Sequence, residues 1–169
     1  MTGLLRIFVL ALLVAAWGSG ARAQGAQVAF GGLQHDSTLP IEISADRLTI
    51  DQADGTALFA GNVRIGQGAL RISAARVLVE YAAGEDEPTG RISRLLATGG
   101  VTLVNGSEAA EAQEAEYLVE TGIITMSGNV ILTQGANALS AGGMVIDLNS
   151  GQAVLQGRVR TILQPGADR

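Results

Sequence analysis

The sequence predicts an all-β protein, a rolled or folded-over antiparallel sheet built from repeated short strands. Apolar and polar residues alternate with a period of two through most of the chain. Glycine accounts for 23 of the 169 residues and interrupts nearly every ten-residue window, which disfavours long helices. Two short motifs also alternate along the chain, each in four copies. Because one such repeat cannot bury its apolar face alone, neighbouring copies must stack into a continuous core.

The first 23 residues have the features of a cleavable signal peptide. Arg6 precedes an apolar run at 7–17, which is shorter than the roughly 20 residues that a membrane-spanning helix needs. Ala21 and Ala23 then form a small-residue cleavage signal. We expect export through this leader and cleavage after Ala23; an uncleaved membrane anchor is the alternative.

The rest of the chain divides into three parts. Residues 24–39 are small and polar without periodicity, which predicts a flexible N-terminal arm. The β-domain is expected over 40–163, beginning with a strand that has Ile41 and Ile43 on one face and Glu42 on the other. Residues 164–169 are left as a C-terminal tail.

The first motif ends in the order apolar, any residue, apolar, acid, and it occupies 43–51, 72–80, 112–120 and 139–147. The second motif has a central glycine, at positions 61, 99, 128 and 157. The spacing between the first two of these glycines is longer than the later spacings, which is explained by an acidic loop inserted at 82–90. Gly61-Asn62 and Gly128-Asn129 favour a turn or bulge with positive φ. Alternation then places Val63 and Ile65 inward and directs Arg64, Arg71 and Arg76 outward.

Composition argues against several classes of function. The chain has no cysteine, so disulfides and thiolate metal sites are impossible. Without the leader it keeps 9 basic against 16 acidic residues, a net charge of −7 with no basic tract, which argues against nucleic acid as a partner.

No cofactor motif, metal site or catalytic constellation is evident, and we expect no enzyme. His35, Asp36 and Ser37 are consecutive, so their side chains cannot converge as a triad. Carboxylates gather in the third repeat without a ligand loop around them and predict a solvated strand face; they are Glu108, Glu111, Glu114, Glu116 and Glu120.

Three segments together resemble the LptA/OstA-like family: PIEISAD at 40–46, LFAGNVRIGQGALRISAARVLVEY at 58–81 and MSGNVILTQG at 126–135. The similarity runs from about Pro40 to Leu163. It implies an open β-jelly roll, also described as a β-taco, working in the periplasm. It further implies that lipopolysaccharide, through the acyl chains of lipid A, travels in an apolar groove. The implied protein partners are an LptC-like inner-membrane component, an LptD-like outer-membrane translocon and further copies of the chain, joined head to tail by edge strands.

The same resemblance assigns residues. Positions implicated in lipid contact correspond here to Ile41, Leu103, Tyr117 and Val119, which alternation also directs inward. Together with the other inward residues, the predicted groove comprises Ile41, Ile43, Leu48, Ile50, Phe59, Val63, Ile65, Val77, Val79, Leu103, Tyr117, Val119 and Met126. The predicted edge-strand interface comprises Pro40, Ile41, Glu42 and Ile43 at one end, and Val159, Arg160, Thr161, Ile162 and Leu163 at the other.

Two alternatives stay open at this point. An apolar stripe is also the normal core of a β-protein, so the chain could be an exported structural β-solenoid with a dry interior and no ligand. A small periplasmic hydrolase is the weaker alternative, because no polar residue stands out as catalytic. The sequence does not separate groove-lining residues from sealed core residues.

Overall fold

The structure is a computed structural model that describes residues 25–30, 36, 38–82 and 90–162. These residues form one eleven-stranded antiparallel sheet, which confirms the predicted fold class. The described part contains no helix, and therefore none that could cross a membrane. The leader, His35, Leu163 and the tail at 164–169 lie outside the described residues.

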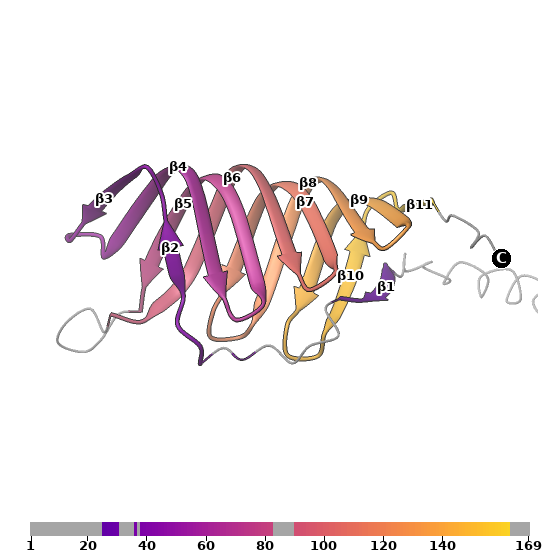
Figure 1. Cartoon of the computed structure of the whole chain (residues 1–169), viewed down its shortest axis with the longest axis horizontal. Helices are drawn as coiled ribbons and strands as arrows, with labels where there is room; N and C mark the ends of the chain where they lie inside the picture. Colours follow the sequence, from indigo (N-terminus) through magenta and orange to yellow (C-terminus); the bar gives the residue numbers. More distant parts are fainter. Residues whose placement is uncertain (1–24, 31–35, 37, 83–89, 163–169) are drawn as a thin grey trace, which may run out of the picture.

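Six long strands form the body of the sheet and pair in chain order (Figure 1); they are β4 (Thr56–Gln67), β5 (Leu70–Tyr81), β6 (Ile92–Asn105), β7 (Glu108–Leu118), β8 (Ile123–Gln134) and β9 (Asn137–Asp147). Two short strands, β2 (Glu42–Ser44) and β3 (Arg47–Asp51), both pair with β4 at the N-terminal end. At the C-terminal end β10 (Gln152–Gln156) and β11 (Arg160–Ile162) both pair with β9.

Each pair of long strands is interrupted near its middle by a shift in register, and the shifts divide the sheet into two walls. Wall A contains residues 56–60, 76–81, 92–98, 114–118, 123–127 and 143–147, flanked by β3 and β10. Wall B contains residues 63–67, 70–74, 101–105, 108–112, 130–134 and 137–141, flanked by β2 and β11.

The bends occur where the sequence predicts positive φ. Gly61 and Asn62 have φ of 82° and 47°, and Gly128 and Asn129 have 82° and 52°, so this prediction is confirmed. Asp46 secures the first bend: its N–H donates to the Gly61 carbonyl at 2.9 Å, and its Oδ2 accepts from Asn62 Nδ2 at 2.7 Å. The chain does not reverse at these glycines. It bends and continues as the same strand, because the bulge interrupts the ladder for only two residues.

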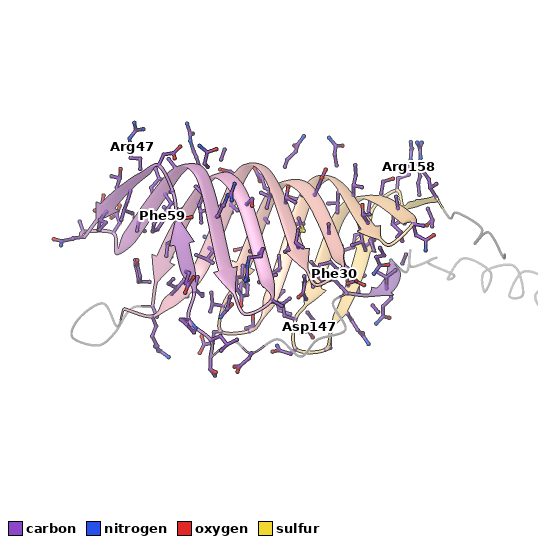
Figure 2. The ribbon with its side chains drawn as sticks, viewed as in Figure 1. Phe30, Arg47, Phe59, Asp147 and Arg158 are labelled. Carbon is purple, nitrogen blue, oxygen red and sulfur yellow. The ribbon has the colours of Figure 1, made fainter. Side chains whose placement is uncertain are left out.

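The walls meet along the bends and end on the opposite side in hairpin turns; we call that side the mouth. Figure 2 shows Arg47 and Arg158, which lie beside bends, along one long side of the molecule, and Phe30 and Asp147 along the other. Inward side chains from both walls form one continuous apolar cluster, with Val77, Leu103 and Ile146 fully buried.

The expectation of a flexible arm over residues 24–39 is corrected by the structure for residues 25–30. Ala26–Ala29 form strand β1, which pairs antiparallel with β10 at the far end of the sheet (Figure 1). Phe30 follows it and is only 1% exposed, and its N–H donates to the Gly151 carbonyl at 2.8 Å. Four residues are too short a run to reveal a strand by periodicity, and their partners lie more than a hundred residues away.

Candidate functional site

The structure separates the predicted groove residues by exposure. One group is sealed between the walls and consists of Val63, Ile65, Val77, Val79, Leu103, Tyr117 and Met126. A second group is partly buried against this core and consists of Ile41, Ile43, Phe59 and Val119. Leu48 and Ile50 form the third group, because they are 50% and 63% exposed on β3.

The sealed group means that the walls pack directly on each other over most of the length of the roll. Val77, Val79, Leu103 and Met126 have no exposed surface, so a lipid chain cannot reach them while the walls keep this spacing. Contact with these residues would require the walls to separate. Surface available to a ligand without such a change lies at the mouth and at the N-terminal end.

A cavity of about 580 Å³ opens at the mouth and brings together residues that are distant in sequence. Ile41 approaches it beside wall B, Val119 lies at the end of wall A, and Ile92 adds a further apolar side chain. Arg91 and Glu120 also line this cavity. Ile41 and Val119 are two of the four positions that the family resemblance associates with lipid contact.

Beneath this cavity a hydrogen bond joins the two walls. The Tyr117 hydroxyl, from wall A, donates to Gln67 Oε1, from wall B, at 2.8 Å. Gln67 Nε2 in turn donates to the Leu39 carbonyl at 3.0 Å, which ties the segment before β2 to the same pair. Tyr117 and Gln67 are each 2% exposed, and burial raises the pKa of the Tyr117 phenol to about 12. Tyr117 therefore serves as a polar tie across the interior.

Gln67 was missed by the sequence analysis, although a signal for it exists. It continues the alternation of Val63 and Ile65, which places a polar amide inward where it must find partners. Asn105 and Gln134 follow inward residues in the same way, and each precedes a hairpin turn of wall B. The mouth side of wall B thus carries a row of amides.

Gln134 uses its amide to hold the N-terminal segment. Its Nε2 donates to the Ala29 carbonyl at 2.5 Å and to Glu108 Oε1 at 2.9 Å. Ala29 itself belongs to β1, which extends wall A. Together with the buried phenyl ring of Phe30, this bond connects the two walls at the C-terminal end of the mouth.

The predicted interface residues lie at the two ends of the sheet. Glu42 and Ile43 are in β2, preceded by Pro40 and Ile41, while Arg160, Thr161 and Ile162 form β11 and follow Val159. Within the described residues, β2 and β3 pair with β4 alone, and β11 pairs with β9 alone. Each therefore has an edge toward solvent. The exposed Leu48 and Ile50 belong to the N-terminal edge.

The outer face carries the charges. Arg94 pairs with Glu80 at 2.8 Å and with Glu116, and the hydrogen bond that Arg94 Nε donates to Glu116 Oε1 is the main cause that raises the pKa of Arg94. Arg64 and Arg71 line an open cavity of about 690 Å³ next to Leu39 and Pro40. Among the described residues, no group of three or more His, Cys, Asp or Glu side chains is placed to hold a metal ion.

Matches to this chain are found among family models, curated sequences and solved structures. A family model described as LptA/(LptD N-terminal domain) LPS transport protein matches residues 42–152. An uncharacterized protein of Rhizobium meliloti (strain 1021) is 30% identical over 154 residues, which cover 87% of this chain and 83% of that protein.

The solved structure of LptH from Pseudomonas aeruginosa has the same fold. It is described as the LptA-homologous periplasmic component of a conserved lipopolysaccharide transport device. The TM-score is 0.67 at 16% identity, and the alignment covers 78% of this chain and 99% of that one.

Proposed function

Because this chain belongs to the family of LptA and LptD N-terminal-domain lipopolysaccharide transport proteins, we propose that it is a periplasmic carrier that shields lipid A acyl chains from water. The observation that carries the proposal is the mouth cavity, which is lined by Ile41 beside wall B, by Val119 at the end of wall A, and by Gln67 of the cross-wall hydrogen bond. In this proposal the protein is exported through its leader and performs no chemistry on the lipid. It stabilises the lipid by removing acyl chains from water, which is worth about 0.8 kcal/mol for each CH₂ group buried.

We place the first contact with lipid at the mouth. Acyl chains lie against Ile41, Ile92 and Val119, and deeper binding at Leu103 requires the Tyr117–Gln67 bond to break and the walls to separate. The energy for that separation comes from outside the protein, from the inner-membrane complex that delivers the lipid.

Bridging between the membranes is the second part of the proposal. Copies join head to tail, with β2 and β3 of one copy continuing the sheet beyond the C-terminal strands of the next. An LptC-like component and an LptD-like translocon would pair with the two terminal edges in the same manner. Such a contact uses different surfaces on its two sides, so it is open-ended and depends on concentration. Exposure of Leu48 and Ile50 at one edge supports it, because apolar surface of this kind favours burial by a partner.

Photocrosslinking in the exported protein tests the lipid path at three depths. A photoreactive side chain is placed at Val119 in the mouth, at Leu103 in the sealed interior, and at the outward Arg76 as the control. We expect lipopolysaccharide adducts at Val119 and none at Arg76. Adducts at Leu103 as well would mean that the walls open during transport.

The same experiment separates the carrier from its rival. Sealing of Val77, Val79 and Leu103 is the observation that favours a structural scaffold with a dry core. If folded protein gives no adduct at Val119 or Leu103, a fourth probe is placed at Ile41, and failure there as well would overturn the carrier proposal and favour that scaffold.

A further inference from the structure

Strand β1 occupies a position in the sheet that a neighbouring copy would otherwise fill. It pairs antiparallel with β10, the last strand of wall A, through four residue pairs from Ala26↔Leu155 to Ala29↔Gln152. At the other end of the same wall, β3 pairs antiparallel with β4. Strands β4 to β10 alternate in direction, so β4 and β10 run the same way, and β1 and β3 therefore also run the same way. In direction and wall, β1 stands in for β3 of the next copy.

The side chains that point inward from the two strands differ in size. Ala26 and Val28 lie on the inward face of β1, opposite the buried Leu155 and Ala153. The corresponding face of β3 carries Leu48 and Ile50, which are half exposed or more in the single chain. A β3 strand seated on β10 would therefore bury more apolar surface than β1 does.

Phe30 adds buried apolar surface to the β1 contact and so offsets the smaller side chains of β1. Its ring is 1% exposed, its N–H donates to Gly151, and the neighbouring Ala29 carbonyl accepts from Gln134 of wall B. The half of the edge that belongs to wall B, strand β11, has no such cover among the described residues. The C-terminal edge is thus half occupied, and the occupying strand is held by its ladder with β10 and by the buried Phe30.

We propose that β1 and Phe30 form an intramolecular cap that must leave β10 before β3 of a second copy can pair there. The proposal rests on the head-to-tail pairing of the proposed function. The cap makes assembly conditional, because a copy with its C-terminal edge closed cannot extend a chain. Closure for about 99% of the time would weaken the apparent affinity between copies about a hundredfold.

A reversible lock tests the cap in the full-length protein. Ala29 and Gln152 are register partners on the outward face, and the chain contains no cysteine, so Ala29→Cys with Gln152→Cys creates a single possible disulfide. Phe30→Asp, which places a charge where the buried ring lies, releases the cap. Self-association is followed by sedimentation velocity over a concentration series. We expect the oxidised protein to stay monomeric and reduction to restore the wild-type concentration for half-maximal association. Phe30→Asp should lower that concentration roughly a hundredfold.

Ile50→Arg in the Phe30→Asp protein identifies the incoming strand and should abolish association. Equal concentrations for half-maximal association of the oxidised and reduced proteins would overturn the cap while head-to-tail pairing stands. Association that survives Ile50→Arg would show that β3 is not the competitor and would also overturn the cap. Failure of every form to associate, Phe30→Asp included, would overturn head-to-tail pairing and the cap with it. Lipid adducts at Val119, measured on the same proteins, decide the carrier proposal independently.

Discussion

The two ends of the sheet differ in how far their edge strands are covered. At the N-terminal end β3 leaves Leu48 and Ile50 exposed, and Phe59 beside them is only partly buried. At the C-terminal end β10 is covered by β1, and Phe30 is packed between the walls. The same repeat forms both ends, so the difference comes from the N-terminal segment, which covers the wall A half of the C-terminal end and leaves the N-terminal end open. In the head-to-tail pairing proposed above, the N-terminal end can accept a partner directly, whereas β10 can do so only after β1 leaves it.

The largest expected effect comes from the phenylalanine at each end. Phe30→Ala should lower the free energy of unfolding by about 3 kcal/mol, because it removes a fully buried ring. Phe59→Ala, at the open end, should cost about half as much, since its ring already contacts solvent. Urea denaturation of both variants measures the difference. Equal losses would contradict the contrast between a packed and an open end.

Alkaline pH should weaken the cross-wall tie near the open end. The pKa of Tyr117 is raised to about 12 from an ordinary 10.0, so its contribution to stability is complete below pH 10. Between pH 10 and 12 the unfolded chain releases the proton while the folded chain retains it, and stability falls by on the order of 3 kcal/mol. Thermal denaturation across this range measures the loss. Tyr117→Phe is the control and should not show this loss of stability between pH 10 and 12. An equal loss in both proteins would show that Tyr117 is not its cause.

The two amides that hold the N-terminal segment provide a smaller contrast. Gln67→Leu should cost about 1–3 kcal/mol, because it leaves the buried Tyr117 hydroxyl and the Leu39 carbonyl without this partner. Gln134→Leu should cost about 0.5–1.5 kcal/mol, since its bond to Ala29 is exposed to water. Hydrogen exchange in β1 should rise for Gln134→Leu and stay unchanged for Gln67→Leu. The reverse pattern would show that the amides do not act locally.

The smallest expected effect on stability concerns the two terminal edges. Ile50→Arg and Ile162→Arg each replace a side chain that is more than 60% exposed, so the free energy of unfolding should change by less than about 0.5 kcal/mol. Sedimentation should nevertheless show weaker self-association for Ile50→Arg. A large loss of stability in the Ile50 variant would mean that β3 packs within its own chain.

Much of the site was predictable, because it depends on local pattern. Alternation placed Ile41, Val119 and Tyr117 inward, and the structure has all three facing the interior or its mouth. Alternation gives the direction of a side chain but not the distance between the walls, so it could not separate the exposed Ile50 from the sealed Val77. That separation depends on which strands have neighbours.

By itself the sequence determined the repeat, the all-β class and the bends, because each depends on the conformational preferences and spacing of residues that are close together in the chain. Gly61-Asn62 adopts positive φ through its own backbone preferences, and a period of two fixes which residues share a face. Only the tertiary structure decided that β1 pairs with β10 at the C-terminal end, that Phe30 belongs to the core and that Tyr117 bonds across the walls. Each of these contacts joins residues 50 or more positions apart, and the stacking of every intervening strand determines whether they meet.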